Sequence, residues 1–147
     1  MEERINELIS ILESEERMYV ATRAHGPGFV RFVIEEYPEV KELIEIGDPA
    51  AEILLNKFKD TLSSTDVALS CFAYVLEKLD YKSAVPTLIN FLKDYVVQTP
   101  VFWAPHLVAH ALKVLTSQEG IDEKYYSYNT QEREETIRLA EDWLKKI

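Results

Sequence analysis

The segment AAEILLNKFKD at residues 50–60 returns as AVPTLINFLKD at residues 84–94, 34 positions further along the chain. The asparagine, the closing Lys-Asp pair and most of the apolar positions recur in the same order. A fixed internal period of this length indicates stacked supersecondary units. The repeat therefore decides the fold, and we take residues 38–115 as its core.

The helix ends of successive units can be aligned in the same way. Two apolar rows result, namely Leu43, Leu76 and Leu112, then Ile46, Leu79 and Leu115. The period is thus 33 and then 36 residues, with the difference taken up in the turns. A single helical hairpin cannot bury its apolar side alone, so the hairpins must stack. We predict an all-α protein, an α-α superhelix formed as a short solenoid of hairpins.

Apolar residues at helical spacing predict the elements of the chain. The expected helices are residues 2–16, 39–46, 49–60, 65–79, 84–97, 101–116 and 130–146. Phe29–Glu36 has the β-branched and aromatic content of a strand, but its helical neighbours favour a helix that Pro27 can begin. The whole chain, 1–147, is then one domain, with residues 1–37 and 121–147 as its N-terminal and C-terminal caps.

Turn residues mark the junctions between these helices. Pro38 is expected to break or kink the chain and so to interrupt the first repeat. Gly47 suits a left-handed position at a helix end, and Asp48 suits the N-cap of the next helix. Residues 63–65 are expected to supply another cap, and Ser83 a third.

These junctions resemble those of HEAT repeats of the short bacterial type. Residues 46–51, IGDPAA, look like the family's turn between helices, and residues 75–80 followed by 83–88 are similar to it. The segment 111–120, together with Ile137 and Trp143, is similar to the C-terminal cap of many bacterial HEAT-repeat proteins. The resemblance covers residues 38–147 and implies that the second helix of each hairpin lines a concave face. The arginine that the family carries early in this helix is missing here.

The composition restricts the possible partners. A formal charge of −10 opposes binding to nucleic acid and fits a basic protein partner instead. No apolar run reaches the roughly 20 residues of a membrane span. A single cysteine, Cys71, excludes an internal disulfide framework and agrees with a reducing compartment. We expect a cytoplasmic protein that binds neither nucleic acid nor a membrane.

Candidate chemistry along the chain is sparse. His106 and His110 stand four residues apart on one helix, but Leu107 occupies the place of the zincin glutamate and no third ligand is evident. Cys71 has no cationic neighbour in the sequence that would make it a nucleophile. The glycines around Pro27 lack the Gly-Lys-Ser/Thr ending of a phosphate loop. We therefore predict no catalytic residue, no metal and no cofactor.

The repeat also predicts a binding surface. If the leucine row is buried, residues two positions earlier point away from the core, and the resemblance places them on the concave face. The predicted surface consists of Ser70, Tyr74, Glu77, Trp103, His106, His110 and Lys113. Aromatic and histidine side chains suit protein binding, although Trp103 and Tyr74 can equally complete the core between hairpins. We predict a non-enzymatic adaptor, scaffold or neutralising partner; the alternative is a small-molecule-binding enzyme or accessory of the lyase-type HEAT-like class.

Overall fold

A computed structural model of the chain describes residues 1–14, 27–59, 64–94, 103–118 and 130–147. Every regular element within these ranges is a helix, which confirms the all-α class. The helices are α1 (Glu2–Leu12), α3 (Pro27–Glu35), α4 (Pro38–Ile46), α5 (Asp48–Lys57), α6 (Asp66–Lys78), α7 (Val85–Asp94), α8 (Ala104–Thr116) and α9 (Thr130–Lys145), with a 3-10 helix at Lys82–Ala84.

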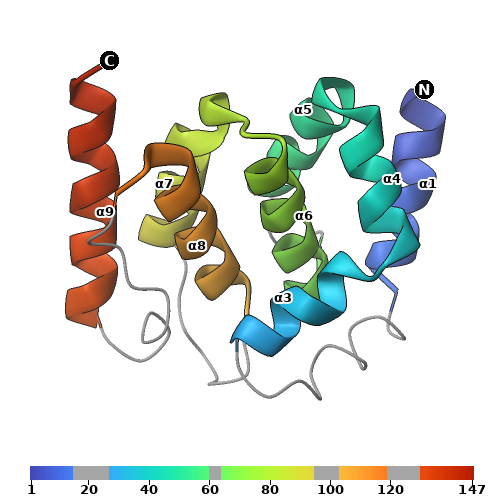
Figure 1. Ribbon diagram of the computed structural model, residues 1–147, viewed down its shortest axis with the longest axis horizontal. Helices are drawn as coiled ribbons and strands as arrows, with labels where there is room; N and C mark the ends of the chain where they lie inside the picture. Colours follow the sequence, from blue (N-terminus) through green and yellow to red (C-terminus); the bar gives the residue numbers. More distant parts are fainter. Residues whose placement is uncertain (15–26, 60–63, 95–102, 119–129) are drawn as a thin grey trace.

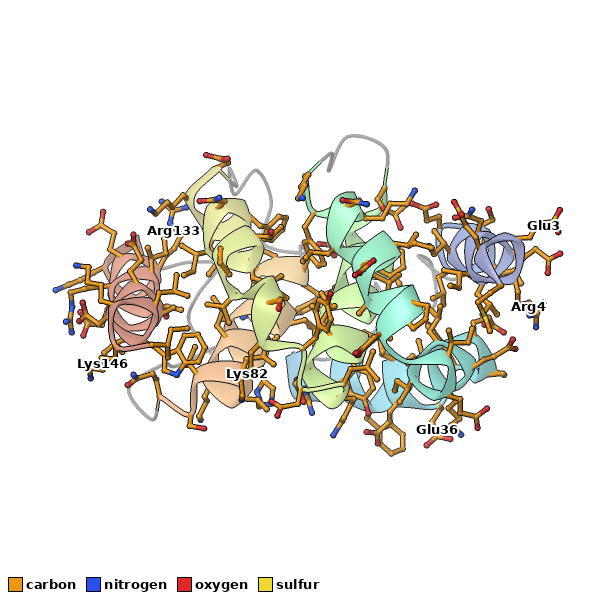
Figure 2. The ribbon with its side chains drawn as sticks, turned by 90° about the horizontal axis from the view of Figure 1, so that it is seen from above. Glu3, Arg4, Glu36, Lys82, Arg133 and Lys146 are labelled. Atoms are coloured by element: carbon orange, nitrogen blue, oxygen red, sulfur yellow. The ribbon has the colours of Figure 1, made fainter. Side chains whose placement is uncertain are left out.

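The helices stand in a row that runs from α1 at one end to α9 at the other (Figure 1). Viewed from above, α5 and α7 form one layer, while α4, α6 and α8 form a second layer beside it (Figure 2). The contacts agree with this order, because α6 packs against α4 on one side and α8 on the other. The end of α5 also meets α7 in the first layer, where the rings of Phe58 and Phe91 lie edge to face with centroids 5.3 Å apart.

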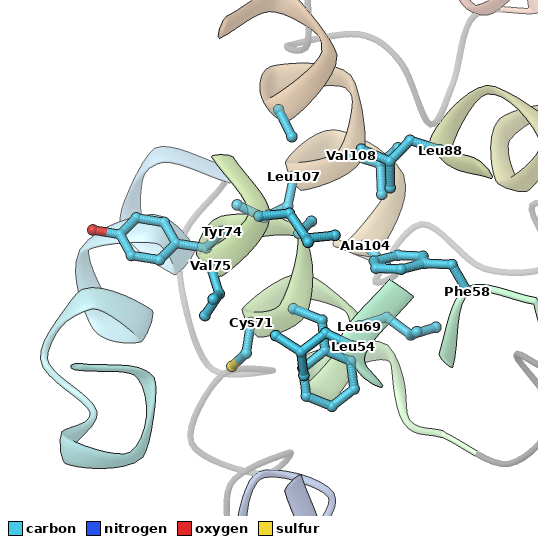
Figure 3. Close-up of a cluster of buried hydrophobic side chains, with 14 of the residues drawn as sticks. Leu54, Phe58, Leu69, Cys71, Tyr74, Val75, Leu88, Ala104, Leu107 and Val108 are labelled. Atoms are coloured by element: carbon cyan, nitrogen blue, oxygen red, sulfur yellow. The ribbon is translucent and has the colours of Figure 1, made fainter. Parts of the chain in front are cut away.

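Helix α6 is the centre of the core. Every residue from Val67 to Glu77 is buried, so this helix is enclosed on nearly all sides. Figure 3 shows side chains of α5, α6, α7 and α8 meeting around it, among them Leu54, Leu69, Leu88 and Val108. The aligned leucines Leu43, Leu76 and Leu112 are all fully buried, as the repeat predicts.

Residues 29–35 lie in a helix, α3, and not in a strand. Pro27 begins α3, where its missing N–H costs nothing because the first helical N–H groups have no partner within the helix. Val30 and Ile34, one turn apart, are fully buried against the core. These two side chains hold α3 in contact with α4, α6 and α8.

The junctions on either side of α4 confirm one expectation and correct another. The chain breaks at Pro38 as expected, because α3 ends at Glu35 and Pro38 occupies the first turn of α4 after an extended Tyr37. Gly47 has a positive φ of 84°, as predicted, but it also serves as the N-cap of α5: its carbonyl oxygen accepts from the N–H groups of Ala50 and Ala51. Asp48 is therefore the first residue of α5 and not its cap, although its charge suits that position.

The next junctions give one confirmation and one correction. The Thr65 hydroxyl oxygen accepts from the Ala68 N–H at 3.1 Å, so the predicted cap of α6 is confirmed. Ser83 was expected to cap α7, but it lies inside the 3-10 helix, which runs directly into α7 and leaves no gap to cap. Parts of the expected elements at 15–16, 60, 95–97, 101–102 and 121–129 lie outside the described residues.

Among the described helices, none combines the length and the apolar character needed to cross a lipid bilayer.

Candidate functional site

The structure corrects the expected exposure of the predicted binding residues. Ser70, Tyr74 and Glu77 on α6 are buried, and His106 on α8 is only 1% exposed. They do not point away from the core as the repeat suggested, because α3 packs against both α6 and α8 on that side. His110, Lys113 and Trp103 remain partly exposed. The structure thus divides the predicted surface into a buried part and an accessible part.

Glu77 joins three helices. Its carboxylate accepts a forked pair of hydrogen bonds from the Arg31 guanidinium of α3, at 2.5 Å and 3.1 Å. The His110 Nε2 of α8 lies 3.7 Å from the same carboxylate. The Glu77 side chain is 3% exposed, whereas those of Arg31 and His110 are each 22% exposed. A bidentate arginine compensates the charge of this buried carboxylate, so Glu77 anchors α3 to α6.

Tyr74 lies beside this bridge, with cations around its ring. The Arg31 guanidinium carbon is 5.2 Å from the ring centre, and the Lys78 ammonium nitrogen is 5.4 Å from it. The hydroxyl donates to the Glu35 carboxylate at 3.3 Å. Burial, followed by the negative charge of Glu35, raises the pKa of the Tyr74 hydroxyl above its usual value. Figure 3 shows the ring extending from α6 away from Leu88 and Val108. The tyrosine thus ties α3 to α6.

Asp66 fixes the start of α8. Its two carboxylate oxygens accept from the Trp103 and Ala104 backbone N–H groups at 2.8 Å and 2.9 Å. An acidic residue of one helix thus caps the next, which satisfies donors that have no partner within their own helix. Burial raises the pKa of the Asp66 carboxyl, and the two hydrogen bonds oppose that rise without cancelling it.

Trp103 and His106 lie together at this capped end. Their ring centres are 6.0 Å apart, with the planes tilted by 43°. Trp103 borders the core, and its indole N–H finds no hydrogen-bond acceptor in the described part of the chain. His106 is buried in the core below it. This pair therefore completes the core at the start of α8, the alternative that the sequence left open for Trp103.

The accessible groups form a surface that we name the α3–α6–α8 face. It comprises Arg31, Phe32, Lys78, His110, Lys113 and Val114, and the buried Tyr74 ring lies next to Arg31 and Lys78. Phe32 is 56% exposed and Val114 is 41% exposed, so two apolar side chains reach solvent beside the charged groups. His110 lies one turn from Lys113 and Val114 on α8, which places all three on one side of that helix. The face combines arginine, aromatic and apolar groups.

Sequence reasoning missed Arg31 and Asp66. Arg31 is the only charged residue in the apolar run Phe29–Ile34, and a lone charge in such a run is a sign of a buried partner. Nothing local identifies that partner, since Glu77 is 46 positions away. Asp66 follows the cap residue Thr65, where an acidic side chain is also favourable for its own helix. Its role as a cap of α8 depends on N–H groups 37 and 38 positions away, which no local pattern specifies.

Two shallow depressions lie elsewhere, around α1. One, of about 680 Å³, is lined by Met1, Pro38, Lys41, Glu42, Glu45 and Ile46. The other, of about 440 Å³, is lined by Glu3, Asn6, Glu7, Ser10 and Ile11. Neither contains His106, His110 or Trp103. Within the described ranges, no three His, Cys, Asp or Glu side chains are grouped so as to hold a metal ion.

Comparison of the chain with models of protein families, with curated proteins and with solved structures gives no match in any of the three.

Proposed function

We propose that this protein is a non-enzymatic protein-binding module that uses the α3–α6–α8 face. The observation that carries the proposal is the Arg31–Glu77–His110 bridge, with Tyr74 packed beside it. Arginine is enriched among the residues that dominate protein interfaces. Here Glu77 and Tyr74 hold the guanidinium in place, so little side-chain freedom is left to lose when a partner binds.

The HEAT-like solenoid is part of this proposal. It is supported by the order of contacts α4–α6–α8, by the Phe58–Phe91 contact between neighbouring hairpins, and by the burial of the aligned leucines. In such an arrangement α6 and α8 belong to the second-helix layer. Helix α3 then covers part of that layer and adds its own side chains to the surface. The repeat alone led us to expect that this surface consists only of exposed side chains of α6 and α8.

The alternative function, a small-molecule enzyme or accessory, required a deep pocket lined by His106, His110 and Trp103. His106 is buried in the core, and neither of the two depressions described above is lined by it, His110 or Trp103. The carboxylate nearest to His110 is already neutralised by Arg31. These groups favour a surface that holds a protein over a cavity that holds a substrate.

Site-specific photo-crosslinking tests the proposal. A photoreactive amino acid at position 114 lies on the α3–α6–α8 face, and the same amino acid at position 11 lies on α1. The natural residues, Val114 and Ile11, have equal exposure of 41%, which makes the second site a matched control. We expect a discrete crosslinked protein from position 114 in extracts of the native organism, and none of that mass from position 11. Equal labelling from both positions would refute the proposal.

A further inference from the structure

The negative charge of the chain is distributed unevenly among its helices. Helices α3, α6 and α8 carry as many basic residues as acidic ones, so the whole formal charge of −10 lies outside them. Helix α8 contains no acidic residue at all. The acids of the three helices are Glu35, Asp66 and Glu77, and the bases are Arg31, Lys78 and Lys113.

Two of these three carboxylates are not available on the α3–α6–α8 face. Asp66 caps α8 with both of its oxygens and lies at the other end of α6, about 16 Å along the helix from Glu77. The Glu77 side chain is only 3% exposed. The basic side chains do reach solvent, since that of Lys78 is 45% exposed and that of Arg31 is 22% exposed.

The Glu77 carboxylate is shared by groups from three helices. It accepts the forked hydrogen bonds of Arg31, and the Lys78 ammonium nitrogen lies 4.0 Å from it. His110 approaches the same carboxylate to 3.7 Å. One negative charge cannot balance two cations, so positive charge remains at the solvent side of this cluster.

The other charges of the face leave this excess in place. Glu35, which accepts from the Tyr74 hydroxyl, is a partly exposed carboxylate beside the cluster. Lys113 offsets it, because this lysine is partly exposed and makes no ion pair within the described ranges. Three basic side chains therefore stand against two carboxylates, of which one is buried. On the adjoining turns the charges are paired: Glu36 with Lys41 at 3.9 Å, and Asp80 with Lys82 at 3.0 Å.

Apolar side chains accompany these cations. Five large apolar side chains of the described ranges are exposed, and two of them are the first and last residues of the chain. Of the other three, Phe32 and Val114 belong to the α3–α6–α8 face, with exposures of 56% and 41%. A partner that covers this face can therefore shield apolar surface from water while its charged groups meet the cations.

We infer that the partner of the α3–α6–α8 face presents a short acidic amphipathic segment. Its carboxylates meet Arg31, Lys78 and Lys113, and its apolar side chains cover Phe32 and Val114. This inference rests on the proposed function, because it names the class of partner for the same face. The overall charge fits a basic partner, whereas the local charges of the face favour an acidic one. Physiological salt screens charges beyond about 8 Å, so the local charges decide the contact.

A pair of synthetic peptides tests this inference. The probe contains leucine and glutamate at amphipathic spacing, and its control carries lysine in place of glutamate. Binding to the isotope-labelled full chain is followed by amide chemical-shift changes at physiological salt. The variant Lys113→Glu reverses one charge of the face, and Lys145→Glu on α9 is its matched control. Both lysines lie in the last turn of their helices, so both variants lose the same favourable contact with a helix end.

We expect the glutamate peptide to shift amides of α3 and of the second half of α8. Lys113→Glu should weaken this binding about three- to tenfold, from the loss and reversal of one exposed pair. Lys145→Glu should bind like the wild type. Equal weakening by both variants would show attraction by net charge alone and would overturn the inference, as would failure of the glutamate peptide to bind.

Two further outcomes separate this inference from the proposed function. If the lysine peptide bound the α3–α6–α8 face at least as tightly as the glutamate peptide, the acidic partner would be refuted and protein binding by the face would stand. If a short oligonucleotide with the charge of the glutamate peptide bound there equally well, the face would be a general anion site, and the inference would be overturned. The crosslinking experiment at position 114 tests the proposed function independently of both peptides.

Discussion

At the scale of single residues, Glu77 joins the structure to the proposed binding surface. Its side chain is 3% exposed, and a carboxylate buried to this degree is tolerated only with a close cation. Arg31 supplies that cation by a forked contact from another helix. The same contact fixes the outer atoms of the arginine at the surface. One ion pair therefore stabilises the fold and orients the side chain that we expect a partner to contact.

The first prediction concerns this ion pair. Arg31→Met keeps most of the side-chain volume but leaves the Glu77 carboxylate without its forked donor. We expect the free energy of unfolding to fall by about 2–3 kcal/mol, below the range for a fully buried pair because Arg31 is partly exposed. Urea titration followed by circular dichroism measures the change. Arg138→Met is the matched control, since Arg138 lies on the surface of α9 and should show no measurable loss. A neutral Arg31→Met would contradict the structural role of the bridge.

At the scale of elements, α6 organises both of its neighbours through polar groups at its two ends. Asp66 at its start caps α8, and Glu77 near its end holds α3. Between these ends the helix is buried throughout. Since the apolar contacts set how close the helices lie, the polar groups at the ends fix the position of each neighbour along α6. Loss of either end group should therefore affect one neighbouring helix more than the other.

The second prediction is a pH dependence at Asp66. Its folded-state pKa is raised above the ordinary 3.8, so in the window above 3.8 the folded state binds more protons than the unfolded state. By linkage, this group's contribution to stability falls as the pH rises through that window and increases as the pH falls. We expect the stability of the wild type relative to Asp66→Asn, which does not titrate, to grow on acidification. Urea titrations of both proteins at several pH values above 3.8 measure the difference in their free energies of unfolding. If this difference became smaller on acidification, the folded-state pKa of Asp66 would be lowered, which would contradict the prediction.

The helices and the alignment of their buried leucines could be predicted from the sequence. Which of the site residues are exposed could not. The spacing of Leu43, Leu76 and Leu112 is a periodic pattern, and such a pattern can be recognised in the sequence itself. The burial of Tyr74 depends on α3, a helix outside the repeat, so the repeat period contains no information about it. The Arg31–Glu77 pair joins positions 46 residues apart, and no local pattern specifies such a contact.

At the scale of the whole molecule, the row of helices presents different chemistry at different places. The α3–α6–α8 face combines Arg31, Phe32 and His110, whereas the depression beside α1 and α4 is lined by Met1, Pro38, Lys41, Glu42, Glu45 and Ile46. Of the two, only the face combines an arginine with an exposed aromatic ring, and we therefore assign the proposed binding to it.

The most direct test of the proposed function is hydrogen–deuterium exchange, measured by mass spectrometry on the purified protein alone and with the partner identified by crosslinking. Binding to the α3–α6–α8 face excludes water from α3 and from the second half of α8, and it restricts their local opening. We predict slower exchange in the peptides covering residues 27–35 and 110–117, with α9 unchanged. Protection confined to α1 and α4, or to α9, would contradict the assignment of this face as the binding surface.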